Sequence, residues 1–188
     1  ILAGNPGEPA RDNGRDVFDF FDDFDSSSID GSAWTTSSSG NATTEQHNGL
    51  LHIRTAAKSV SAVDVASTNT FSSPVAVRFK ANISAGQNND WKVLGLGVSN
   101  ANHGLAQPNS SVCFNAVGSN LFSYHSLTED KNEKNKRYPV LLAYPVQNIT
   151  WGIRWLATGI EFSPSGNCRP HELSEQANES IPLRFGIN

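Results

Sequence analysis

The feature that most constrains this chain is a succession of short segments in which apolar and polar side chains alternate. The alternation is clearest from residue 75 to 81, where Val75, Val77 and Phe79 share one face of an extended chain and Arg78 lies on the other. A period of two is typical of a half-buried β-strand. Helical periodicity is nearly absent, so the sequence predicts an all-β protein.

Other segments of the same kind follow at regular spacing, separated by turns rich in glycine, serine and asparagine. Asn48-Gly49 favours a tight hairpin turn, and similar turn residues occupy 118–120 and 157–159. Many short strands with such turns indicate a sandwich or jelly roll. The further strands expected are 50–54, 91–98, 112–117, 121–125, 149–156, 160–162 and 183–187.

Length and charge narrow the class of protein. A chain of 188 residues fits a single all-β domain. The formal net charge of −4 argues against nucleic-acid binding, which requires a basic surface. No apolar run reaches the roughly 18 residues of a membrane-spanning helix. Because the chain starts at Ile1 and contains no methionine, we expect it to derive from a longer precursor.

Several motifs, in order along the chain, resemble those of concanavalin A-like lectin/glucanase domains. The resemblance covers residues 17–188 and implies an antiparallel two-sheet β-sandwich, the jelly roll found in long bacterial and archaeal surface proteins. Residues 1–16, which contain two prolines and three glycines, are expected to be an N-terminal segment and linker. The motifs that carry the resemblance are DFFDDFD at 19–25, IDGSAW at 29–34, NGLLHI at 48–53, FSSPVAVRFK at 71–80, ITWGIRW at 149–155, GIEF at 159–162 and IPLRFG at 181–186.

The first motif predicts an extended edge strand. With a period of two, Phe18, Phe20 and Phe24 would share one face, and Asp19 and Asp23 would share the other.

The four tryptophans divide into two groups. Trp34, Trp151 and Trp155 are expected to be core or rim residues because an indole ring buries a large apolar area. Trp91 follows a polar stretch at 87–90 and is the candidate for stacking on a sugar ring.

The glucanases that this chain resembles place paired carboxylates on one strand, in an E-x-D-x-x-E arrangement. Retaining glycosidases need two carboxyl groups about 5 Å apart. No such triplet occurs here: Glu161 stands alone in its hairpin, and Glu172, Glu175 and Glu179 have other spacings. The sequence therefore predicts no catalytic residues and no enzymatic activity.

An acidic cluster near the first motif leaves two interpretations open. Asp23, Asp25 and Asp30 could hold calcium, which prefers carboxylate and carbonyl oxygens, and jelly rolls of this superfamily often bind calcium near their first strand. Alternatively, the charges protect an edge strand from pairing with another chain. No other cofactor is indicated.

Cysteines and glycosylation motifs favour an extracellular or cell-surface location. Cys113 and Cys168 are the only cysteines, and a disulfide between them would contribute up to about 4 kcal/mol in the chain-entropy model. The alternative is two buried thiols. Sequons of the Asn-x-Ser/Thr type occur at Asn41, Asn82, Asn109, Asn148 and Asn178, which are candidate glycosylation sites.

The two ends of the chain suggest how it could assemble. Relatives usually continue into one more strand after the last motif, whereas this chain stops at Asn188, so we expect an open sheet edge. The apolar segment Ile1, Leu2, Ala3 and Gly4 is a candidate donor strand for a neighbouring subunit. The first hypothesis is therefore a surface filament or adhesin subunit that self-associates into a polymer. The alternatives are a glycan-binding module that uses its concave sheet to hold polysaccharide, and a degraded hydrolase domain.

Overall fold

The computed structural model describes residues 14, 18–55, 61–84, 91–97, 111–117, 120–126, 136–140, 146–164, 169–172 and 180–187. Nearly all of the regular structure in these ranges is β. None of the described segments forms a helix long and apolar enough to cross a membrane. The strands are β1 (Trp34–Ser39), β2 (Thr43–His47), β3 (Leu50–Arg54), β4 (Ala62–Phe71), β5 (Val75–Ile83), β6 (Trp91–Gly97), β7 (Ser111–Val117), β8 (Asn120–Ser126), β9 (Lys136–Pro139), β10 (Val146–Trp155), β11 (Gly159–Phe162), β12 (Arg169–Glu172) and β13 (Ile181–Ile187).

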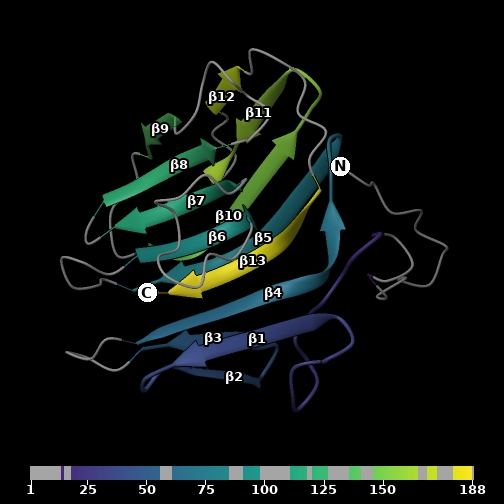
Figure 1. Cartoon of the computed structure of the whole chain (residues 1–188), viewed down its shortest axis with the longest axis vertical. Coiled ribbons are helices and arrows are strands. Elements are labelled where there is room, and N and C mark those ends of the chain that lie inside the picture. Colours follow the sequence, from purple (N-terminus) through teal and green to yellow (C-terminus); the bar gives the residue numbers. More distant parts are fainter. Residues whose placement is uncertain are drawn as a thin grey trace, which may run out of the picture.

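Two antiparallel sheets form a sandwich. Within the described ranges, the larger sheet has seven strands in the order β1-β4-β13-β6-β7-β8-β9, and the smaller has four in the order β12-β11-β10-β5. Strands β2 and β3 form a separate hairpin. The last strand, β13, lies between β4 and β6 near the middle of the larger sheet (Figure 1). This arrangement confirms the predicted antiparallel two-sheet β-sandwich.

Aromatic side chains from both sheets fill the space between them. Phe114 of β7 makes edge-on contacts with Trp151 of β10 and Phe162 of β11, with ring centroids 4.7 and 5.3 Å away. Phe185 of β13 contacts Phe79 of β5 at 5.3 Å. Such pairs add about 0.5–1.5 kcal/mol each to the free energy gained by burying their area. These contacts fix which face of the larger sheet is turned towards the smaller one.

Three tryptophans belong to this interior, as predicted. Trp151 and Trp155 are fully buried on β10, and Trp34 is buried at the start of β1.

The expected edge strand at residues 18–24 does not form, so that prediction is wrong. Phe24 has a φ of 56°, and its backbone N–H donates to Asp22 Oδ1 at 2.8 Å, which bends the chain and breaks the period of two. Phe20 and Phe24 nevertheless pack on Trp34, with ring centroids 5.1 and 5.7 Å away, whereas Phe18 is 58% exposed. The segment is therefore an irregular cover over Trp34.

The hairpin predicted at Asn48-Gly49 is confirmed. Both residues have positive φ values, 54° and 69°, as a two-residue turn with the twist of the flanking strands requires. The turn joins β2 to β3.

The N-terminal segment, by contrast, is not tested. Gly14 alone of residues 1–16 lies within the described ranges, so the boundary between linker and domain stays a prediction. The candidate donor strand from Ile1 to Gly4 also lies outside them.

Candidate functional site

The face of the seven-stranded sheet that is turned away from the smaller sheet is called the outer face below. Since Phe185 and Phe114 point inward, their alternate neighbours point outward. On β13 these outward residues are Arg184 and Gly186. The register places Arg184 opposite Gly95 of β6 and Gly186 opposite Asp64 of β4. Arg184 and Asp64 are therefore diagonal neighbours on the outer face.

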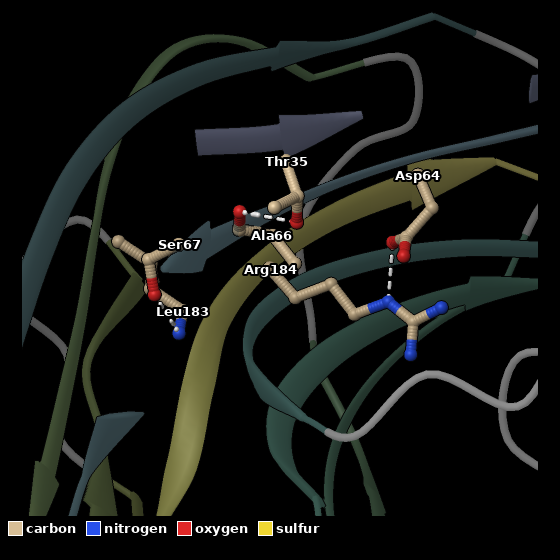
Figure 2. Close-up of polar contacts among 6 residues, drawn as sticks. All are labelled: Thr35, Asp64, Ala66, Ser67, Leu183 and Arg184. Carbon is tan, nitrogen blue, oxygen red and sulfur yellow. Dashed lines mark hydrogen bonds and ion pairs between the residues drawn. The ribbon is translucent and has the colours of Figure 1, made fainter. Parts of the chain in front are cut away.

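An ion pair joins these two side chains. Arg184 Nε donates a hydrogen bond to Asp64 Oδ1, and the side chains are only 9% and 18% exposed. The terminal guanidinium nitrogens, Nη1 and Nη2, donate to none of the described residues and are not among the buried polar atoms without a partner. They are turned away from the carboxylate (Figure 2). Asp64 therefore uses only the Nε donor of Arg184.

A local irregularity in the pairing of β4 and β13 sets this geometry. The register shifts just before Arg184, and the backbone N–H of Leu183 donates to Ser67 Oγ at 2.9 Å instead of to the backbone (Figure 2). Thr35 Oγ1 of β1 donates to the Ala66 carbonyl oxygen at 3.1 Å on the other side of β4. The Ser67 hydroxyl thus satisfies the Leu183 N–H where the β4–β13 ladder shifts, and beyond the shift Arg184 lies opposite Ala66.

Two glycines lie close to Arg184, Gly95 opposite it on β6 and Gly186 two residues further along β13. Gly95 has a φ of +141°, and a Cβ there would lie 2.7 Å from Ile153 Cδ1 and 2.8 Å from the Val112 carbonyl oxygen. A Cβ at Gly186 would lie 3.2 Å from Asp64 Oδ1. At Gly95 the backbone conformation requires glycine. At Gly186 the absence of a side chain leaves space for the Asp64 carboxylate to lie across β13.

The Asp64–Arg184 pair is partly removed from water, and this affects the pKa of Asp64. Burial raises the pKa of the Asp64 carboxyl above its ordinary value, and it outweighs the charge and hydrogen bond of Arg184, which lower that pKa. When both groups are ionised, their formal charges cancel.

The centre of the outer face is enclosed. Arg184 and Val93 are each 7% exposed, and Cys113 is 0% exposed, although their register positions lie on this face. A ligand that reached the guanidinium here would lose much of its water, which strengthens each hydrogen bond it makes with the protein.

Carboxylates are scarce on the larger sheet. Its seven described strands contain one, Asp64. Glu161, which was singled out from the sequence, lies on the smaller sheet, where its Oε2 is 2.6 Å from Nη1 of the 60% exposed Arg154. The described residues therefore do not assemble the pair of carboxyl groups that common glycosidase mechanisms use.

The predicted calcium ligands make local contacts. Asp30 Oδ1 accepts hydrogen bonds from Ser32 N and Oγ at 2.9 and 2.6 Å, and Asp23 Oδ1 accepts one from Asp25 N at 3.3 Å. Among the residues that the structure describes, no three His, Cys, Asp or Glu side chains converge as a metal site. Calcium at Asp23, Asp25 and Asp30 stays a prediction.

The other predicted sites are partly described. Cys113 is buried on β7, but Cys168 falls outside the described ranges, so the disulfide stays a prediction. Trp91 is the first residue of β6 and pairs with Val117, but its side chain is not among those that the structure describes. Stacking on a sugar is therefore also untested.

Three sequon asparagines lie within the described ranges, and all three are exposed. Asn41 lies in the turn after β1, whereas Asn82 and Asn148 lie side by side on the smaller sheet, where Asn148 N donates to Asn82 Oδ1 at 2.5 Å. Asn109 and Asn178 lie outside these ranges. Exposure permits glycosylation, which stays a prediction.

One histidine pair was not anticipated from the sequence. His47 and His52 stack across the β2–β3 hairpin with ring centroids 4.1 Å apart. Burial of the ring, then the neighbouring His47 and Arg54, lower the pKa of His52, and Glu45 acts in the opposite direction. The pair lies on the separate β2–β3 hairpin.

Sequence reasoning also missed Arg184 and Asp64. The available signal was a single charge in each of two otherwise apolar runs, VDV at 63–65 and IPLRFGI at 181–187. Charges inside such strands are uncommon unless they are paired.

Comparison with solved structures shows what this arrangement is similar to. A β-1,3-1,4-glucanase (lichenase) from a mouse hindgut metagenome has a TM-score of 0.65 and 10% identity, over 88% of this chain and 83% of that chain. The β-glucanase of Bacillus licheniformis has a TM-score of 0.63 and 10% identity, over 89% and 83%. A Bacteroides ovatus GH16 protein in complex with a G4G4G3G product has a TM-score of 0.60 and 8% identity, over 90% and 86%. These matches confirm the concanavalin A-like jelly roll.

Sequence comparison adds little. A family model described as a domain of unknown function (DUF2341) matches residues 1–37, which is too small a part of the chain to assign a family. No curated protein matches significantly.

Two predictions are contradicted by the structural neighbours. The first hypothesis, a filament or adhesin subunit assembled by strand complementation, does not agree with a fold shared with glucanases and a transglycosylase. These neighbours favour the alternative, a carbohydrate-binding domain. The prediction that the chain has no enzymatic activity is contradicted by the same neighbours, which include endo-glucanases. That prediction used the spacing of carboxylates in the sequence, whereas the correction comes from the fold that the chain shares with these enzymes. Self-association has no support in the structure.

Proposed function

We propose that this domain binds polysaccharide on the outer face of the seven-stranded sheet, with Arg184 and Asp64 as the polar centre of the site. The observation that carries the proposal is a largely buried ion pair whose guanidinium keeps Nη1 and Nη2 available. Sugars expose rows of hydroxyl groups that both donate and accept hydrogen bonds. A fixed guanidinium beside a carboxylate offers both kinds of partner, and a few convergent polar groups of this kind give a binding site its specificity.

The surroundings of the pair support the same proposal. Gly186 has no side chain at the register position opposite Asp64, so the carboxylate lies across β13 next to Arg184, and a sugar hydroxyl there meets an acceptor and donors together. The glucan-directed names of the structural neighbours favour a glucan as the first ligand to test. We also propose an extracellular or cell-surface location, where such polymers occur.

The neighbours favour a second candidate, cleavage or transfer of glycosidic bonds, because they include endo-glucanases and a transglycosylase. The usual mechanism needs two carboxyl groups, and the described strands of the larger sheet supply Asp64 alone. The second group would have to come from outside these strands.

Binding can be tested with a soluble mixed-linkage β-glucan and the full chain in isothermal titration calorimetry. We expect Arg184→Gln to weaken binding at least about tenfold, which corresponds to about 1.4 kcal/mol. Arg154→Gln is the matched control, since Arg154 is also an ion-paired arginine but lies on the smaller sheet. Equal binding by Arg184→Gln and the wild type would overturn the proposal. Cleavage is tested in the same samples by measuring the number of reducing ends, which increases when a glycosidic bond is hydrolysed.

A further inference from the structure

The charges of Arg184 and Asp64 also determine which glycans the site accepts, an inference that rests on the proposed function. We infer that Asp64 is a specificity-determining residue: it neutralises Arg184, so that the outer face accepts uncharged glycans and rejects those that carry uronic acids.

Asp64 occupies one edge of the Arg184 guanidinium. A carboxylate binds arginine most strongly by two parallel hydrogen bonds along one edge of the fork. Asp64 Oδ1 already accepts from Arg184 Nε, so the edge that contains Nε is taken. Gly186 makes this possible, because a Cβ there would lie 3.2 Å from Asp64 Oδ1. A ligand therefore meets the Nη1–Nη2 edge, which still offers two donors, so discrimination against a carboxylate depends on the charge of Asp64.

Asp64 also balances the charge of Arg184. Asp64 lies beside Arg184, so the formal charges of this pair cancel. A uronate carboxylate would give up its water in an enclosed region and would meet the negative charge of Asp64. Desolvation of an anion is unfavourable unless a positive charge compensates it. A sugar hydroxyl carries no charge and pays no such penalty.

Replacing Asp64 by asparagine removes its negative charge. An asparagine at this position keeps an oxygen that can accept from Arg184 Nε, so the side chain of Arg184 stays in place. Its positive charge is then uncompensated, which attracts a carboxylate and makes the interaction sensitive to salt. Asp64→Asn should therefore reverse the preference of the site and not abolish binding.

The test compares two forms of one polymer: a soluble mixed-linkage β-glucan, and the same glucan oxidised at C6 to the uronic acid. We expect the wild type to bind the neutral form at least about tenfold more tightly, with little dependence on sodium chloride concentration. We expect Asp64→Asn to bind the oxidised form more tightly than the neutral form at low salt. Glu161→Gln, which removes the partner of Arg154 on the smaller sheet, should leave the wild-type ratio unchanged.

The outcomes separate this inference from the proposed function. Failure of the wild type to bind either polymer overturns both. Binding of the oxidised form as tightly as the neutral form by the wild type overturns the inference and leaves polysaccharide binding intact. An Asp64→Asn variant that folds but keeps the wild-type ratio also overturns it. If that variant does not fold, the wild-type ratio and its salt dependence decide.

Discussion

Replacing Arg184 by methionine removes the guanidinium while a flexible apolar chain of similar length fills its space. Asp64 then keeps its partly buried position without its partner, since its side chain is only 18% exposed. Removing one partner of a buried ion pair typically costs about 3–5 kcal/mol of unfolding free energy. Because Asp64 retains some contact with water, we expect about 2–3 kcal/mol at pH 7.

The loss should depend on pH, and its direction follows from the pKa of Asp64. Burial already raises that pKa in the folded protein, and Arg184 opposes the effect through its charge and hydrogen bond. Without Arg184 the pKa rises further. The folded variant then binds a proton more tightly than the unfolded chain, so stability is highest below the unfolded pKa and falls as pH rises through the folded pKa. The variant should therefore lose stability at pH 7 and recover most of it near pH 4.

Chemical unfolding followed by fluorescence of the four tryptophans measures this loss directly. The double variant Arg184→Met with Asp64→Asn has no carboxylate to leave unpaired, so it should be more stable than Arg184→Met at pH 7. An equal loss for Arg184→Met at pH 4 and pH 7 would show that Asp64 is not the cause. A double variant as unstable as the single one would contradict the reasoning in the same way.

Three further variants test other parts of the structure by the same unfolding measurement. Gly95→Ala should cost about 3 kcal/mol, because its φ is +141° and the new Cβ would lie 2.7 Å from Ile153 Cδ1; a loss below about 1 kcal/mol would mean that the strand relaxes. Trp34→Phe should cost about 2 kcal/mol and make residues 18–33 more sensitive to protease, because the 2.6 Å bond from the indole N–H to Asp22 Oδ2 is lost; unchanged proteolysis would contradict this. Arg154→Ala should change stability by less than about 0.5 kcal/mol, because its ion pair is exposed, and a larger loss would assign that pair a structural function.

Strands with strict alternation could be predicted from the sequence, and polar ones could not. β5 alternates along its length, and the β7–β8 and β10–β11 hairpins are marked by turn residues. By contrast, β1 reads WTTSSS and the second half of β4 reads STNTF, which resemble loops. These two strands pair with each other at the edge of the larger sheet, where hydroxyl side chains face solvent. Pairing with β13 on its other edge, which the local pattern does not reveal, holds β4 in the sheet.

The candidate site could not be predicted from the sequence either, because it too depends on contacts between distant strands. Arg184 and Asp64 are 120 residues apart, and they meet because the last strand inserts between β4 and β6. Each charge could be noticed within its own apolar run, but their pairing depends on this strand order and on the register shift before Arg184. For the acidic segment at 19–25 the error was the opposite one, because a strand was predicted where none forms. Its regular pattern predicted a strand, but the turn at Asp22 and Phe24 prevents one.

The central claim is that glycan binds to the outer face of the larger sheet at Arg184. A titration of isotope-labelled protein with a mixed-linkage β-glucan oligosaccharide, followed through the arginine side-chain NMR signals, tests it most directly. The exposed Arg78 and Arg154 on the smaller sheet provide an internal reference. We predict that the Arg184 signal shifts in a saturable way while those two do not move. Shifts confined to Arg78 and Arg154, or no saturable shift at Arg184, would contradict the claim.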